Sequence, residues 1–383
     1  MPHPYGFEPS QLSLPLDVVA RHSADVDKKG RFPEESIAAL GAAGLLGLTV
    51  PTELGGLGQG PRAFCVAAEE LARECASTAM VYVMHTSALQ AISASKRLGE
   101  REAILRAAAK GKHLSTLSLS EKGSRSQFWA PVSKMAAKGD GFVTSAAKSW
   151  VTSASFADSY VSSAQAPGAQ SPLESTIYLA RTEGAEVRPE SAFDGLGLRG
   201  NDSSPVSLQD LPVSKQDLIS EQGKGADTML GVILPWFAVG SAAMAHGLCR
   251  AAVDATAKHL SSAGFEHTGT QLRDLPQLRA RLAQMFVRTE ASRALLGRTL
   301  GEMEVGAPEA PLFVLSARKA ALEAALEVTD LALKACGGAA FSRQATPIER
   351  LFRDARAGWV MAPTVDHLLE FSGRALTGLP LFG

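Results

Sequence analysis

The hydrophobic pattern of this chain changes twice along its length, and that change limits the fold more than any other feature. Up to residue 112, apolar residues such as Ile37 and Leu40 recur at helical spacing. From 113 to 218 the chain is rich in Ser, Gly, Thr and Val, and short apolar runs alternate with turn signals. From 219 onward the helical pattern returns. The sequence therefore predicts an α+β fold with helices on both sides of a β region.

We predict three domains from this pattern. They are an N-terminal α-helical domain (1–112), a middle β-barrel-like domain (113–218) and a C-terminal four-helix bundle (219–383). In the first, Ala- and Leu-rich segments at about 62–75 and 77–110 are expected to be helices. In the bundle, 274–300 and 309–335 are long amphipathic stretches. The residues expected on the buried stripe of 274–300 are Leu275, Leu278, Leu282, Met285, Phe286 and Leu296.

Charge and hydropathy exclude several classes of protein. The net charge is −1 and no basic block is present, which argues against nucleic-acid binding and against attachment to anionic membranes. The N-terminus has no signal-peptide pattern, and we expect no membrane span because no uninterrupted apolar window approaches the length that a bilayer requires. We therefore expect a cytoplasmic protein.

The cysteines and histidines do not form a metal-site pattern. The chain has 4 cysteines and 8 histidines, without a C-x-x-C pair or a ligand spacing typical of zinc. We expect no metal and four buried thiols in a reducing compartment. These are Cys65, Cys75, Cys249 and Cys336.

Three segments carry residue types that suit a planar, phosphate-bearing ligand. Residues 117–126 read LSLSEKGSRS, a β-like run entering a turn whose hydroxyls and N–H groups can hold a polar ring edge or a phosphate. In KSWVTSA, Trp150 and Thr152 are two apart, so on a strand they share a face and can meet a planar cofactor. In CGGAAF at 336–341, paired glycines allow close backbone approach. Taken singly, the favoured explanations are a serine-rich turn, a core tryptophan and a glycine helix stop.

Together, these segments resemble the acyl-CoA dehydrogenase superfamily, whose motifs are roughly TEPxxGSD, KxWITN, GGxGF and ERLxRDA. The last is matched by ERLFRDA at 349–355, and PTELGG at 51–56 is similar to the family's PxExGG turn. The resemblance covers nearly the whole chain. It implies an FAD-dependent oxidoreductase that removes an α-proton from an acyl thioester, on CoA or a carrier protein, and transfers hydride to flavin. It also implies a homodimer or homotetramer and an electron-transfer flavoprotein as acceptor.

The resemblance assigns FAD-binding roles to five residues in the β region. Leu119 and Ser120 match positions that bond the flavin ring edge, and Ser126 matches the serine that contacts the phosphates. Trp150 and Thr152 match the pair beside the flavin N5 side.

Four further residues match cofactor positions near the C-terminus. Gly337 and Gly338 match the backbone that meets FAD from a neighbouring subunit. Thr364 and Asp366 fall where the family has Thr and Gln near the flavin and its ribityl chain.

The family's usual catalytic glutamate is missing. In the RDAxxxxxxEGT run, the base position is Ala362 here. A subset of the family places the glutamate on the first long bundle helix, where an ungapped match gives Phe237, and residues 231–245 contain no carboxylate. Asp366, about one helical turn after Ala362, is the nearest candidate base; its alternative role is an N-cap or Asx contact.

Other departures leave the reaction open. Lys122 and Gln127 replace the motif's proline and aspartate, and the stretch 261–266 lacks the arginine of the family's RxxFG motif. The base can be a different group, or the reaction can need no carboxylate. A flavin-dependent monooxygenase on the same fold and a non-catalytic flavoprotein are the remaining alternatives.

Overall fold

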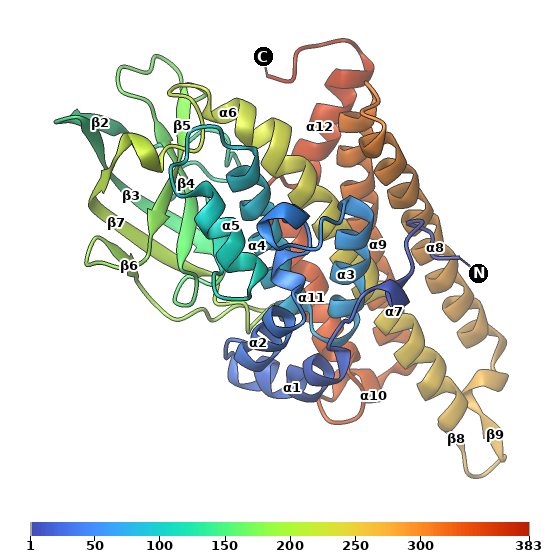
Figure 1. Ribbon diagram of the computed structural model, residues 1–383. Coiled ribbons are helices and arrows are strands. Elements are labelled where there is room, and N and C mark those ends of the chain that lie inside the picture. The colour runs from blue at the N-terminus through green and yellow to red at the C-terminus, as the bar shows by residue number, and fades with distance from the viewer. Residues whose placement is uncertain (1, 383) are drawn as a thin grey trace.

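In the computed structural model, which describes residues 2–382, the strands of the β region lie on one side of the molecule, and the helical regions that precede and follow them in the chain pack together on the other (Figure 1). The second helix begins after Pro33 and ends at Ala42, as its acidic first turn and the left-handed Gly44 (φ 73°) require. The segment 77–110 was expected to be helical throughout, but it contains two separate helices. The first ends before Ser95, whose hydroxyl donates to the Ile219 carbonyl. The N-terminal helices are α1 (Leu16–Lys29), α2 (Glu34–Ala42), α3 (Pro61–Glu74), α4 (Ala76–Ala94) and α5 (Arg101–Ala109).

The β region consists of two sheets that enclose a core of their own. The strands are β1 (Ser115–Ser118), β2 (Met135–Lys138), β3 (Gly141–Val151), β4 (Ser159–Gln165), β5 (Ser175–Arg181), β6 (Val187–Pro189) and β7 (Ser204–Val213). One sheet has the order β1-β4-β5 and the other β2-β3-β7-β6. Gly139 (φ 64°) and Gly168 (φ 76°) make the turns between β2 and β3 and between β4 and β5. Tyr160 and Tyr178 from the first sheet share the buried core with Val206 and Leu208 from the second.

The C-terminal region is a bundle in which α7, α8, α9 and α11 pack together and α12 lies against α9 (Figure 1). Leu278, Met285 and Leu296 are buried as expected. The prediction for Phe286 is wrong, since its side chain is 50% exposed. Phe286 follows Met285 directly, and neighbouring helical residues point about 100° apart. The elements are α6 (Gly225–Thr228), a π-helical turn (Met229–Ile233), α7 (Leu234–Ser262), β8 (Gly264–Phe265), β9 (Thr270–Gln271), α8 (Pro276–Glu304), α9 (Ala310–Cys336), α10 (Gly338–Phe341), α11 (Ile348–Val360) and α12 (Val365–Leu376).

The helical stretch Gly225–Ser262 is long and apolar enough to cross a membrane by composition, with a window of mean hydropathy 1.6. However, 67% of that window is buried inside the protein. Helix α7 packs against α3, α8 and α9, so its apolar surface serves the core of the bundle. All four cysteines are free and buried, as expected.

Candidate functional site

The serine-rich segment 117–126 and the segment 148–154, which contains Trp150, lie side by side in the structure. The backbone N–H of Ser149 donates to the Ser120 carbonyl at 3.0 Å, and the N–H of Lys122 donates to the Ala147 carbonyl at 3.0 Å. The chain leaving β1 therefore pairs with the end of β3. This pairing brings the turn that contains Ser126 and the strand that contains Trp150 to one corner of the β region.

A buried ion pair joins the same two segments. Lys148 Nζ lies 2.6 Å from Glu121 Oε1, and both side chains are almost completely buried. The other carboxylate oxygen accepts the N–H groups of Val132 and Ser133, each at 2.7 Å. Burial alone would raise the pKa of Glu121, but Lys148 and Ser133 outweigh it and the pKa is lowered. Glu121 and Lys148 were not among the predicted site residues, although both lie inside the matched motifs.

Trp150 and Thr152 do not share a strand face, so that expectation is wrong. The register between β3 and β7 shifts between Lys148 and Val151, and Trp150 has a φ of 58°. This bulge turns the Trp150 side chain outward, where it is 67% exposed. Thr152 lies beyond the strand, is buried, and its hydroxyl lies 3.0 Å from the hydroxyl of Ser203. The protein thus presents the indole of Trp150 as an open aromatic surface.

The turn after β1 reaches the start of α12. The hydroxyl of Ser126 lies 3.5 Å from Nδ1 of His367, which lies 3.0 Å from the hydroxyl of Thr364. Thr364 is the N-cap residue of α12, so the alternative reading of Asp366 as the N-cap is wrong. Asp366 is exposed in the first turn of α12. Leu119 is buried at the end of β1.

Arg125 stands at the glycine position of the family motif. Its φ is 54°, in the left-handed region that favours glycine, so an arginine adopts it at some steric cost. The Arg125 side chain is exposed next to Ser126.

The glycine pair lies elsewhere in the molecule. Gly337 and Gly338 are exposed between α9 and α10, and a Cβ atom on either would meet nothing within 4 Å. Figure 1 places α10 and α12 at opposite ends of the bundle. The structure of one chain therefore does not bring Gly337 and Gly338 together with the other predicted site residues.

The two positions that could hold the family's glutamate meet around a buried arginine. Arg318, on α9, is completely buried, and its guanidinium carbon lies 4.7 Å from the centroid of the Phe237 ring. Its Nη2 donates to the carbonyl of Met361 at 3.3 Å, directly before half-buried Ala362. Burial lowers the pKa of Arg318 to about 9. Arg318 was not among the predicted site residues, because a single arginine on a helix carries no local signal of burial.

The ERLFRDA segment forms structural contacts. Arg353 pairs with Asp27 at 2.6 Å and with Glu349, which ties α11 to α1. Asp354 accepts the N–H of Leu198 at 2.7 Å, and burial raises its pKa to about 6. These contacts hold α11 against the rest of the protein.

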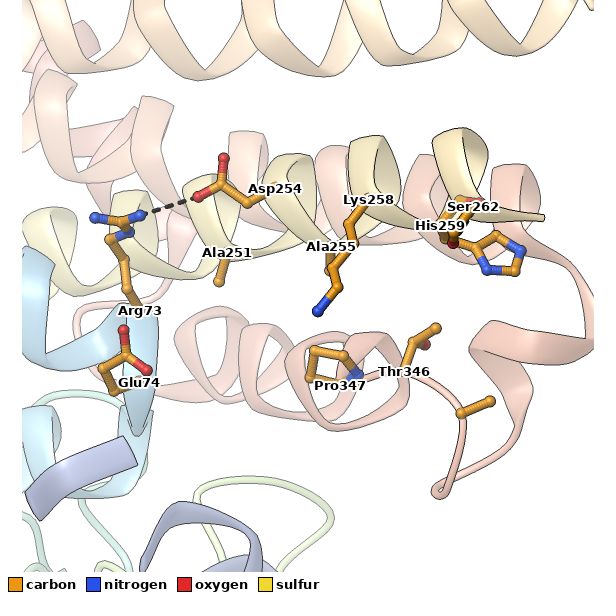
Figure 2. Close-up of a pocket in the computed structure, with 11 residues that line it drawn as sticks. Arg73, Glu74, Ala251, Asp254, Ala255, Lys258, His259, Ser262, Thr346 and Pro347 are labelled. Carbon is orange, nitrogen blue, oxygen red and sulfur yellow. Dashed lines mark hydrogen bonds and ion pairs between the residues drawn. The ribbon is translucent and has the colours of Figure 1, made fainter. Parts of the chain in front are cut away.

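Figure 2 shows a polar cleft of about 380 Å³ between the end of α3, the C-terminal half of α7 and the loop before α11. At one end Arg73 pairs with Asp254 at 3.0 Å. Lys258 and His259 add basic groups along α7. The stretch that lacks the arginine of the RxxFG motif, 261–266, begins shortly after them. None of the predicted site residues lines this cleft.

Comparisons with known proteins agree with the architecture. The N-terminal domain model of acyl-CoA dehydrogenase matches residues 16–112, and the C-terminal domain model matches residues 223–376. A probable acyl-CoA dehydrogenase of Mycobacterium leprae is 27% identical, over 94% of this chain and 91% of that protein. Butyryl-CoA dehydrogenase from Megasphaera elsdenii has a TM-score of 0.89 at 22% identity, over 94% of this chain and 97% of that one. A chain from the structure of an electron transferring flavoprotein of Acidaminococcus fermentans has a TM-score of 0.89 at 23% identity, over 94% and 95%.

Proposed function

Because this chain belongs to the acyl-CoA dehydrogenase family, we propose that it dehydrogenates an acyl thioester carried on CoA or on a carrier protein. It is an FAD-dependent oxidoreductase of acyl-CoA dehydrogenase type. One observation supports the proposal most strongly: the outward-facing Trp150 stands where the end of β3 pairs with the segment after β1. An exposed indole beside a hydroxyl-lined turn suits a planar ring that carries phosphates.

The residues of this corner fit FAD. Trp150 offers a face to the flavin ring, and Ser120 and Leu119 lie on the segment that would meet the ring edge. Ser126 lies on the exposed turn that would meet the phosphates, close to Thr364 at the start of α12. When bound, FAD supplies the hydride acceptor. The chain's own contribution is to orient the cofactor and to exclude water around the acyl group.

The identity of the base is part of this proposal. Ala362 and Phe237 cannot accept a proton, so neither family position supplies one. Asp366 remains our candidate, since it lies in the first turn of α12, two residues after Thr364, on the segment that follows Ala362. Its exposure leaves its carboxylate accessible to a substrate.

The apolar residues at the two glutamate positions also favour a second function. With Ala362 and Phe237 at the two glutamate positions, the fold suits a reaction that needs no carboxylate, such as flavin-dependent monooxygenation. A flavoprotein without catalysis is the third alternative. The three differ in what they consume: a dehydrogenase reduces an acceptor when substrate is added, a monooxygenase needs reduced flavin and oxygen, and a scaffold does neither.

We propose two partners. An electron-transfer flavoprotein suits the dehydrogenase reaction, and one of the similar structures is of such a protein. A second copy of this chain, in a homodimer or homotetramer, suits the exposed Gly337-Gly338 turn. The domain boundaries and the cytoplasmic location remain predictions.

The test is anaerobic mixing of the purified protein with acyl thioesters while the flavin absorbance is followed. Bleaching with at least one thioester, followed by electron transfer to a dye or an electron-transfer flavoprotein, is the expected result. If the protein holds FAD but no thioester bleaches it, and product forms only with reduced flavin and oxygen, the monooxygenase reading replaces the dehydrogenase.

A further inference from the structure

Arg318 is a buried cation with most of its hydrogen-bonding capacity unused. Its side chain is 0% exposed, and neither Nε nor Nη1 has a hydrogen-bond partner among residues 2–382. Within the same residues, Nη2 alone is engaged and donates to the Met361 carbonyl at 3.3 Å. A guanidinium has five N–H donors in a planar fork, and leaving such donors unpaired in the interior is costly.

The other buried arginines of this protein each form an ion pair with a carboxylate. Arg293 pairs with Glu69 at 2.8 Å, and Arg353 pairs with Asp27 at 2.6 Å. Arg318 has no such partner: within residues 2–382, no carboxylate oxygen lies within 4.0 Å of its guanidinium. Consistent with this, burial is the one cause that shifts its pKa, without an opposing acid.

The position of Arg318 in the fold indicates which kind of group can pair with it. The guanidinium lies over the Phe237 ring and bonds the residue before Ala362, so it borders both family positions for the catalytic glutamate. Gly358 on α11 packs closely against Leu322, which lies about one turn along α9 from Arg318. This contact keeps α11 close to the part of α9 that carries Arg318. In the proposed function, the acyl group of the substrate reacts beside these positions.

We infer that Arg318 binds a carboxylate on the acyl group of the substrate, so that the protein acts on the thioester of a dicarboxylic acid. This inference rests on the proposed function, because it names the substrate class of that site. A carboxylate matches either fork of the guanidinium, Nε with the remaining Nη2 hydrogen or Nη1 with it, and would therefore engage one of the two unpartnered nitrogens. The substrate would thus supply the negative charge that this chain lacks at both glutamate positions.

The experiment compares thioesters with equal carbon number and different charge. The FAD-loaded protein is titrated with malonyl and propionyl, succinyl and butyryl, and glutaryl and pentanoyl thioesters, each on CoA and on pantetheine. Binding is followed by the flavin spectrum and by calorimetry. In at least one pair, the charged thioester should bind about 10–100-fold more tightly, the range expected of hydrogen bonds to a charged group.

Variants separate a substrate contact from a purely structural arginine. Arg318→Met should remove the preference for the charged thioester, and Arg318→Lys should keep part of it. Arg356→Met is the matched control, because Arg356 is half-buried on α11 and bonds Thr329 instead, and it should keep the full preference. If Arg318→Met does not fold, the affinities of the native protein and of Arg318→Lys for charged and neutral thioesters still test the inference.

Three outcomes would overturn the inference. The first is a native protein that binds neutral thioesters and prefers no charged one. The second is an Arg318→Met variant that keeps the preference, which would leave Arg318 as an anchor for the Met361 carbonyl. The third is an FAD-loaded protein that binds no thioester of either kind, which would overturn the proposed function as well.

Discussion

Trp150 shows at the level of one residue how backbone geometry decides the role of a side chain. A tryptophan on a strand is ordinarily a core residue, and the alternating pattern of KSWVTSA is compatible with that. The bulge between Lys148 and Val151 and the φ of 58° turn the indole outward instead. An exposed indole contributes little to folding and is free to bind.

We predict that Trp150→Ala weakens FAD binding without unfolding the protein. Loss of stacking between an aromatic side chain and a planar ring should weaken affinity about tenfold or more. The melting temperature of the apoprotein should change little, because the side chain is 67% exposed. Fluorescence titration with FAD measures the affinity. Phe286→Ala, which removes another exposed aromatic, is the control and should bind FAD normally; unchanged affinity in Trp150→Ala would place the flavin elsewhere.

Ala362 is the residue at which a small change should alter the chemistry. Ala362→Glu introduces a carboxylate next to the Met361 carbonyl that Arg318 holds. General-base catalysis is worth about 10²–10⁴-fold, so flavin reduction by a neutral thioester such as butyryl-CoA should speed up by a measurable part of that range. Nearby Arg318 favours the ionised form, so the gain should be present at neutral pH.

The control for this substitution is Ala362→Gln, which has similar size and no base. Anaerobic stopped-flow traces of both variants give the comparison. Equal rates in the two would mean that Ala362 does not border the reacting carbon. Because the new glutamate also neutralises Arg318, Ala362→Glu should bind charged thioesters less tightly than the native protein does.

At the level of elements, the Glu121–Lys148 pair holds the segment after β1 against the end of β3. The buried ion pair, the two backbone hydrogen bonds at 3.0 Å and the N–H groups of Val132 and Ser133 form one connected network. A network of this kind specifies a single position for the turn and for the bulge that follows Lys148.

We predict that Glu121→Gln destabilises the protein by about 3–5 kcal/mol, because it leaves Lys148 buried without a counter-charge. Urea unfolding measures the loss. The double variant Glu121→Gln, Lys148→Met should recover much of it, since neither charge is then buried. A double variant no more stable than the single one would show that the neutral contacts of Glu121 matter more than the ion pair.

The same pair predicts a pH dependence. The folded-state pKa of Glu121 lies below its ordinary value of 4.5, so its stabilising contribution is present above that pH. The contribution is lost as the pH falls through the folded-state pKa. The stability difference between the native protein and Glu121→Gln should therefore narrow at acid pH. A difference that stays constant between neutral pH and pH 3 would contradict the assignment.

For the whole molecule, we propose that a second chain completes the site at the exposed turn between α9 and α10. Gly337 has a φ of 56° and a ψ of −131°, a conformation nearly restricted to glycine, and nearby Phe341 is 80% exposed. In the family resemblance this turn meets FAD bound to a neighbour. A two-fold assembly would place it there.

We predict that Gly338→Leu leaves the single chain folded and lowers both the fraction of oligomer and the FAD content. A Cβ atom at Gly338 would meet nothing within 4 Å in its own chain, so we expect the effect of the substitution to come from a partner or from the cofactor. Light scattering after size exclusion and flavin absorbance measure the two quantities. Gly60→Leu, at another exposed glycine with equal free space, is the control. A native protein that is monomeric at micromolar concentration and still holds FAD would refute the predicted oligomer.

The order of helical and β regions was determined by the sequence itself. Hydrophobic periodicity and turn glycines such as Gly139 and Gly168 act within a few residues, so their effect can be read without the fold. The motifs likewise placed Ser126 and Trp150 in segments that the structure brings together. The absence of a glutamate at Ala362 was also visible from the sequence alone.

Only the tertiary structure decided which charges are buried and what they meet. The outward turn of Trp150 depends on the register of β3 against β7, and the pairing of Lys148 with Glu121 depends on the return of the chain after β1. Arg318 became a candidate because α7, α9 and α11 converge on it. Burial and the supply of counter-charges are sums over segments far apart in the chain, and no local pattern contains them.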